Sequence, residues 1–452
     1  MSRSKARCVR VYCPRFHADG RGLGARRSVV TALLASAIAA FAASAVAETI
    51  PTPPPPLPAA PTPAPPIAPA LPSQPGQPTN PTAPLAPPTT SPSDQSQLAS
   101  ADLLNSESAS YTDAPYMIGD FFAGNGQIVF LPKVTSGKPV PRVVGQLPAA
   151  GGTERAKISD DNSVFPEDRV FFLYNYFDNA ILVPAPSPHV LDINRYTPGF
   201  EKTFFDRNAS IELRIPFANT QNSDVYLAGG KDEDVEFGNL EATLKFLIWR
   251  DSTWAFATGV GFNMPTAADT KVFPVAAAQP LAPTQPLFTI ENDAFHVQPY
   301  FGALWTPDDR WFVQAFAQFD LDANGNHVNQ LNVGDVGVLY DQDLFQVDIQ
   351  AGFWWYRNPQ ARYLTGVAPT IEYHYTTTIQ DASIVAAGTR SGEYFFGNTA
   401  NRLDIQNLTV GLELFIGPRS TLNIAGVLPL NRPNSADRQF DQEIFVQFNR
   451  FF

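Results

Sequence analysis

Residues 407–416 read NLTVGLELFI, and apolar and mostly polar side chains alternate along them. The stretches 345–356 (FQVDIQAGFWWY) and 240–248 (LEATLKFLI) show the same alternation. Successive side chains of a β-strand point to opposite faces, so a period of two over about ten residues predicts strands with one apolar and one mostly polar face. No convincing 3.6-residue amphipathic pattern appears from 167 onward, and the sequence therefore predicts an all-β domain over 167–452.

Fourteen strands are predicted in this domain, over 168–177, 193–205, 209–217, 239–249, 253–262, 294–305, 310–320, 332–340, 344–356, 368–379, 383–389, 403–416, 420–430 and 440–452. Tight turns such as 206–208 and 341–343 alternate with longer links such as 263–293. Short turns at one end and long loops at the other are typical of a closed antiparallel transmembrane barrel. The strand at 383–389 has a weak sequence and serves mainly to keep the strand directions alternating, so twelve strands is the main alternative.

The chain ends with an apolar pattern on one strand face, formed by Ile444, Val446, Phe448 and Phe452. This resembles the C-terminal signature of bacterial outer-membrane proteins, which the barrel-assembly machinery reads, although Arg450 stands where an apolar residue or Tyr is usual. Residues 401–452 also resemble the closing hairpins of porin-like families, including the barrels linked to meta-pathway phenol degradation. The resemblance implies a location in the outer-membrane bilayer and the passage of small solutes, aromatic ones among them.

The six tryptophans stand at the ends of predicted strands. Trp249 and Trp254 flank one tight turn and Trp305 and Trp311 another, whereas 354–355 is predicted to lie at the opposite end of the barrel. Aromatic side chains at two levels would match the two water–lipid interfaces of a transmembrane barrel. Closure also pairs every backbone polar group internally, which a strand domain in lipid requires.

Three segments precede the barrel. Residues 1–47 combine a basic start with an Ala-rich, nearly uncharged run that ends in Ala45-Val46-Ala47, which predicts a secretory signal peptide cleaved after Ala47. Residues 48–100 form a Pro-rich linker, with 19 prolines between 51 and 92, and such a composition predicts a disordered, extended spacer. Residues 101–166 are predicted to be a plug, a periplasmic cap or an extra strand, and the sequence leaves these alternatives open.

Charge and cysteine content exclude several functions. The chain has 43 acidic and 31 basic residues, a balance that disfavours nucleic acid as a partner. Both cysteines, Cys8 and Cys13, lie in the predicted signal peptide, so the mature chain has no disulfide and no thiolate site.

The polar face of the strands is the predicted functional surface. It supplies ten candidate lumen-lining residues: Glu212, Arg214, Glu241, Lys245, Asp348, Gln350, Glu372, His374, Glu413 and Glu443. A polar lining with acidic excess predicts a wet lumen that favours cations or neutral solutes, although neighbouring strands can also satisfy these residues by pairing them and so close the lumen.

No catalytic or cofactor motif accompanies this lining. Glu372 and His374 share one strand face and could hold a metal, but an inward polar pair is more often plain lining, so no metal, cofactor or enzymatic activity is predicted. The leading hypothesis is a passive outer-membrane pore or transporter for small solutes. The alternative is a structural anchor, tethered through the Pro-rich linker to a periplasmic or cell-wall partner. The pattern does not distinguish a monomer from an oligomer.

Overall fold

The computed structural model describes residues 115–120, 126–147, 155, 157–183, 189–219, 223–227, 235–274, 285–433 and 435–452. The predicted signal peptide, its cleavage site after Ala47 and the Pro-rich linker lie outside these residues. Every regular element in the described ranges is a β-strand. None of these ranges contains a helix long and apolar enough to cross a membrane.

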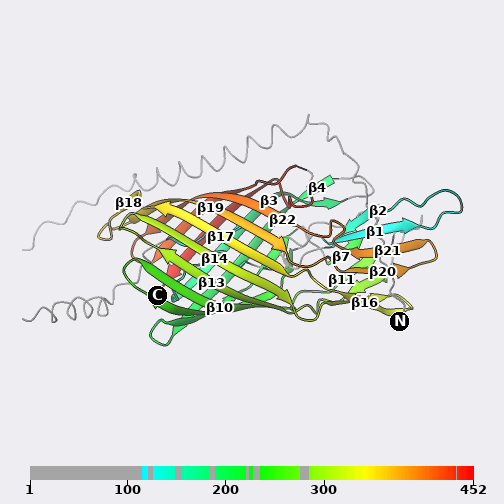
Figure 1. Cartoon of the computed structure of the whole chain (residues 1–452), viewed down its shortest axis with the longest axis horizontal. Coiled ribbons are helices and arrows are strands. Elements are labelled where there is room, and N and C mark those ends of the chain that lie inside the picture. Colours follow the sequence, from blue (N-terminus) through cyan, green and yellow to red (C-terminus); the bar gives the residue numbers. More distant parts are fainter. Residues whose placement is uncertain are drawn as a thin grey trace, which may run out of the picture. The chain divides into compact units, whose positions relative to one another are not determined.

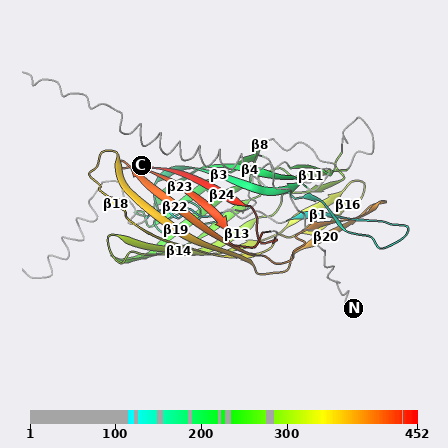
Figure 2. The ribbon, with the colours of Figure 1, turned by 90° about the horizontal axis from the view of Figure 1, so that it is seen from above.

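Twelve antiparallel strands form a closed barrel (Figures 1 and 2). Around the barrel they are β3 (Arg169–Val183), β24 (Gln442–Phe451), β23 (Ser420–Pro429), β22 (Asp404–Ile416), β19 (Leu364–Thr378), β17 (Leu344–Phe353), β14 (Trp311–Asp322), β13 (His296–Trp305), β10 (Trp254–Met264), β9 (Leu240–Arg250), β5 (Ala209–Arg214) and β4 (His189–Phe204). Pairing of β4 with β3, from Arg169 opposite Glu201 onward, closes the ring. The hydrogen-bond ladder of the barrel therefore has no free edge.

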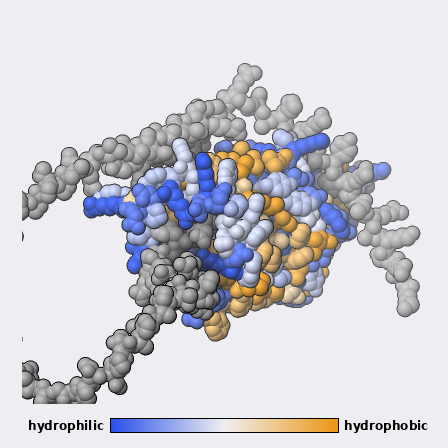
Figure 3. Space-filling model, turned by 60° about the vertical axis from the view of Figure 1, so that its left-hand side comes forward, coloured by the Kyte–Doolittle hydropathy of each residue, from blue (hydrophilic) through white to orange (hydrophobic). Residues whose placement is uncertain are grey.

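The period-two pattern sorts the side chains to the two faces of the wall. In β22, Val410 faces outward and is 55% exposed, whereas Thr409 and Glu413 face inward and are almost fully buried. Apolar side chains gather over the outer surface of the barrel wall (Figure 3). An apolar exterior around a polar interior is the arrangement that a bilayer requires of a spanning barrel.

The links between barrel strands differ in length at the two ends. At one end, which we call the short-turn end, the links are 205–208, 251–253, 306–310, 354–363 and 417–419. At the other end, the long-loop end, the links build two further sheets, which we call the outer sheets. Short extensions β6 (Phe217–Asn219) and β8 (Val235–Phe237) lengthen the barrel wall, and β18 (Tyr356–Arg357) pairs with β19.

The outer sheets share one apolar core. One consists of β2 (Arg142–Gln146), β1 (Gln127–Pro132), β21 (Gly392–Gly397) and β20 (Ile384–Gly388), and the other of β16 (Gly334–Leu339), β15 (Asn326–Gln330), β12 (Phe288–Ile290), β11 (Thr270–Phe273) and β7 (Asp224–Tyr226). Ile128, Val272, Phe288, Val328 and Phe396 are buried in a single cluster drawn from both sheets. The N-terminal hairpin β1–β2 thus completes a sheet made from the link between β19 and β22.

The barrel has twelve strands, so the count of fourteen was wrong and the alternative count is the correct one. The predicted strands 332–340 and 383–389 do form strands, β16 and β20, but these belong to the outer sheets. β16 pairs with β15 and β20 pairs with β21, and neither pairs with a strand of the barrel. Each misplaced strand reverses the direction expected for the strands that follow it, and the second reversal undoes the first. The expected alternation of strand directions therefore did not reveal the error. The predicted tight turn 341–343 accordingly lies at the long-loop end.

The prediction of two tryptophan levels was also wrong. Strand β17 ends at Phe353, which pairs with Trp311 at the start of β14, so Trp354 and Trp355 lie at the short-turn end with the other four tryptophans. Trp355 is 73% exposed, whereas Trp354 is buried against Phe415 inside the barrel. Of the two misassigned strands, only 332–340 precedes β17, so its removal reverses the predicted direction of β17 and moves the two tryptophans to this end.

Candidate functional site: the occupied lumen

The lumen holds two pieces of the N-terminal segment, residues 115–120 and 155–167, which we call the insert. The described residues of both pieces are almost completely buried. Tyr116 contacts Phe451 at the short-turn end, Asp120 bonds to Asn407 at the start of β22, and Arg155 lies beside Asp320 near the long-loop end. The chain therefore runs up the lumen, forms the β1–β2 hairpin in an outer sheet, and returns to the start of β3.

Side chains of the barrel wall satisfy the backbone of the first piece. The backbone N–H of Tyr116 donates to Glu413 at 3.0 Å, and those of Ile118 and Gly119 donate to the two oxygens of Glu372 at 2.8 and 2.9 Å. Gln350 donates in turn to the Tyr116 carbonyl at 2.9 Å. Buried backbone outside a regular ladder needs such partners. The inward polar side chains therefore act here as hydrogen-bond partners of the insert.

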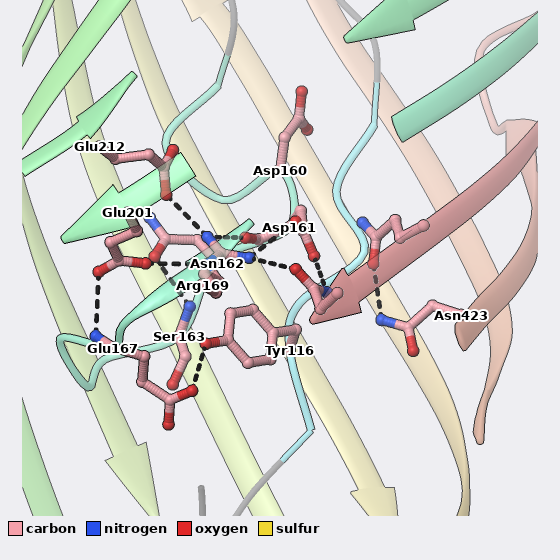
Figure 4. Close-up of polar contacts among 12 residues, drawn as sticks. Tyr116, Asp160, Asp161, Asn162, Ser163, Glu167, Arg169, Glu201, Glu212 and Asn423 are labelled. Carbon is pink, nitrogen blue, oxygen red and sulfur yellow. Dashed lines mark hydrogen bonds and ion pairs between the residues drawn. The ribbon is translucent and has the colours of Figure 1, made fainter. Parts of the chain in front are cut away.

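Arg169 is the centre of an ion cluster near the short-turn end (Figure 4). Its guanidinium bonds to Asp161 of the insert at 2.7 Å and to Glu201 and Glu212 of the wall at 2.9 and 2.7 Å. It also lies over the ring of Tyr116, 4.5 Å from the ring centroid. One buried cation thus joins both pieces of the insert to the wall.

Neighbouring wall cations extend this cluster. Arg214 bonds to Glu212 at 2.6 Å and donates to the backbone carbonyl of Asp160 at 2.6 Å. Lys245 bonds to Glu201 at 3.0 Å. The carboxyl group of Asp160 points away from the Arg169 guanidinium (Figure 4).

A second ion cluster lies further along the lumen. The ammonium group of Lys157 bonds to Asp120 of the insert and at 3.1 Å to Asp348 of β17, and the His374 ring is 2.8 Å from Asp348. Asp120, Asp348 and His374 have the spacing of a metal-ligand group. Lys157, however, already bonds to both carboxylates, so the positive charge that this acidic group requires is supplied by the chain itself.

Small inward-facing residues make room for the insert. A Cβ atom on Gly411 would lie 2.1 Å from Ile118, and one on Gly261 would lie 2.9 Å from Ile158. Ala255 and Ala257, on the same face of β10 as Gly261, pack in a cluster with Met117 and Ile158. At these positions the wall therefore leaves room for side chains of the insert.

Burial shifts the titration of the acidic groups of the insert. It raises the pKa of Asp160 to about 7 against the opposing charge of Arg214, and that of Asp161 to about 6 despite Arg169. It raises the pKa of Glu167 to about 8, although the Tyr116 hydroxyl donates to this carboxylate. For Lys157, the carboxylates of Asp120 and Asp348 outweigh burial and raise the pKa.

The structure places all ten predicted lining residues inside the barrel and buries them. Glu212, Arg214, Lys245, Asp348, Gln350, Glu372, His374 and Glu413 take part in the contacts with the insert or its ion clusters described above. Glu443 accepts a hydrogen bond from Asn175 at 2.7 Å, and Glu241 lies opposite Arg214 in the β5–β9 pairing. Ile444, Val446, Phe448 and Phe452 share the outward face of the last strand and its end.

Sequence reasoning missed Arg169, Glu201 and the charged residues of the insert. Arg169 and Glu201 lie on the inward faces of β3 and β4, directly opposite each other, so the period-two pattern contained them. Asp120, Lys157 and Asp161 lie in irregular chain without a periodic pattern. A signal for the insert was present in the small inward residues of β10, which leave space that Ile158 of the insert shares with side chains of the wall.

A closed ladder of twelve strands, an apolar exterior and a polar interior together decide the class of the barrel. The chain is a transmembrane β-barrel of the outer-membrane type. No family model and no curated protein matches its sequence. Among solved structures, the barrel is similar to an outer-membrane channel from Pseudomonas putida F1 (10% identity, 64% of this chain and 97% of that chain, TM-score 0.37). It is also similar to the NanC porin (8% identity, 63% and 99%, TM-score 0.35) and to the Pseudomonas putida toluene transporter TodX (10% identity, 67% and 94%, TM-score 0.34).

Proposed function

We propose that this barrel is a passive outer-membrane transporter for small solutes whose lumen is closed at rest by the insert. The observation that carries the proposal is the burial of residues 115–120, 155 and 157–167 against the inner wall, where hydrogen bonds and ion pairs hold them. Because these contacts occupy the polar wall, solute passage requires that the insert shift or leave. The acidic excess of the wall then favours cations and neutral solutes over anions.

The contacts favour a non-enzymatic role. His374 is enclosed between Asp348, Glu372 and Thr409, and His296 between Asp320 and Asp341. Both rings are almost fully buried, so neither presents a free nitrogen to a substrate. The anchor alternative gains no support from the described residues, since an anchor has no need of wall side chains matched to a removable insert.

The test is ion conductance of the mature chain in planar lipid bilayers. We expect the full chain to be closed for most of the time, and the variant lacking 101–166 to show discrete, long-lived open steps. A silent deletion variant that is folded and inserted would contradict the proposal.

A reversible lock provides a matched control. Asp161 and Asn449 are hydrogen-bonded at 2.8 Å, and the mature chain has no cysteine of its own. The double variant D161C/N449C should close fully when oxidised and regain open events on reduction, whereas either single cysteine should not respond. Equal conductance of the oxidised and reduced double variant would show that the insert does not control the lumen.

A further inference from the structure

The tip of the β1–β2 hairpin differs in charge from the acidic barrel domain. Residues 121–153 contain no Asp or Glu, although the whole chain has a formal charge of −12. Their three cations, Lys133, Lys138 and Arg142, are all exposed. The segment is therefore a basic region in an acidic protein.

A second hairpin adds a fourth cation beside the first. The backbone N–H of Lys133 donates to the carbonyl of Ser391 at 2.8 Å, which brings the β20–β21 turn and its exposed Arg390 next to the tip. Glu393, opposite Leu131, is the acidic residue of this second hairpin. Among the described residues, none forms an ion pair with Lys133, Lys138, Arg142 or Arg390. The four cations are thus available to a ligand.

The tip also lies where an external ligand can reach it. Both views of the ribbon show the cyan β1–β2 hairpin extending beyond the barrel strands at the long-loop end (Figures 1 and 2). In this class of barrel the long loops face the exterior. Val134 and Val140, which are 43% and 64% exposed, lie between the cations.

We propose that the paired tips, residues 133–142 and 389–391, form a docking surface for an anionic polysaccharide at the cell exterior. A flexible polyanion presents repeated negative groups that can follow cations spaced along a narrow hairpin. Residues 133–142 contain no aromatic side chain for base stacking, which disfavours single-stranded nucleic acid. The tip points away from the barrel wall, so the lipid of its own bilayer is not within its reach.

The experiment measures binding of fluorescent dextran sulfate and of neutral dextran to the full mature chain in detergent micelles. We expect saturable binding of dextran sulfate only, weakening as salt rises because exposed charges are screened. The variant K133Q/K138Q/R142Q/R390Q should lose at least about tenfold in affinity. The matched control K202Q/R207Q/R419Q removes cations from the short-turn end and should bind like the parent.

Three outcomes would overturn the proposal. The first is equal binding by the tip variant and the parent, and the second is equal affinity of the parent for dextran sulfate and neutral dextran. The third is preferential binding of anionic phospholipid vesicles or single-stranded DNA over dextran sulfate. Heat-modifiable migration in electrophoresis shows that each variant retains the folded barrel, so loss of binding by the tip variant reports on the tip.

Discussion

The N-terminal segment is held in two different ways along its length. In the lumen, residues 115–120, 155 and 157–167 have no regular structure, and they are fixed by side chains of the wall and by buried ion pairs. Beyond the barrel, β1 pairs with β21 at six positions and with β2 at four, and its side chains enter an apolar core. One part therefore depends on charge, and the other on backbone pairing and apolar packing.

This difference separates a removable region from a permanent one. Buried ion pairs lose much of their attraction to the cost of desolvation, so a matched insert can leave the lumen if its wall partners rehydrate. An apolar core of Ile128, Phe288 and Phe396 has no such compensation, because its exposure to water is unfavourable at every residue. The outer sheets are expected to keep hold of the hairpin while the lumen part moves.

The largest effect should come from Arg169, which joins the insert to the wall. Arg169→Met leaves Asp161, Glu201 and Glu212 without their shared cation in a buried site. We expect a loss of about 3–5 kcal/mol in the free energy of unfolding, measured by denaturant titration in lipid vesicles. Lys202→Met, an exposed cation on the neighbouring strand, serves as the control and should change little. Equal effects of the two substitutions would contradict the role of charge in the lumen.

The second-largest effect should come from the part of the N-terminal segment that lies in the outer sheets. Ile128→Ala removes a fully buried side chain from the core of the outer sheets and should cost about 2–5 kcal/mol locally. Amide hydrogen exchange should quicken over 127–132 and 142–146, while amides of 116–120 and 157–165 keep their protection. If both regions lose protection together, the segment is one cooperative unit and the proposed division is wrong.

Much of this architecture was predictable because one physical rule governs most of it. Alternation placed the inward residues of β22 and β17, such as Glu413 and Asp348, on the correct face without any knowledge of the fold. The same rule failed for β16 and β20, because a strand in a loop alternates as a membrane strand does and only its pairing partners differ. A minimum of about nine residues for a spanning strand would have excluded the prediction at 383–389 but not the longer one at 332–340.

The path of the insert could not be predicted from local patterns. Its contacts join residues far apart in sequence, such as Ile118 with Glu372 and Asp161 with Asn449, and irregular chain has no period to read. The position of β1 in an outer sheet could not be predicted either, because its partner β21 lies more than 250 residues away in the sequence. The direction of β17, and with it the level of Trp354 and Trp355, depended on the strand count.

A change in pH should have a smaller effect on the occupation of the lumen by the insert. Released carboxyl groups have ordinary pKa values near 4, whereas docking raises those of Asp161, Asp160 and Glu167 to about 6, 7 and 8. The state in which the insert occupies the lumen thus binds these protons more tightly than the state in which the insert is released. Proton binding stabilises the occupied state fully below about pH 4, and this stabilisation is lost as pH rises toward 8. Lys157, whose pKa is raised, stays protonated throughout this range.

The open fraction of the full chain should therefore rise at least about tenfold between pH 5 and pH 8, as measured by single-channel recording. The variant D160N/E167Q should flatten this dependence because it removes two of the titrating groups. A parent whose open fraction falls with rising pH would show that other groups control docking.

The smallest effect should come from an exposed ion pair that belongs neither to the ion clusters of the lumen nor to the apolar core of the outer sheets. Arg402 bonds to Asp381 at 2.8 Å at the base of the β20–β21 link, and their side chains are 58% and 70% exposed. Solvent and salt screen such a pair, so Arg402→Gln should leave both the unfolding midpoint and the amide exchange of 127–132 unchanged within error. The N–O distance of this exposed pair is close to those of the three buried Arg169 pairs, so the contrast between the two substitutions compares an exposed ion pair with a buried ion cluster. A clear loss of protection in β1 would instead mean that surface charge helps to hold the outer sheets, and the apolar core alone would no longer account for their grip on the hairpin.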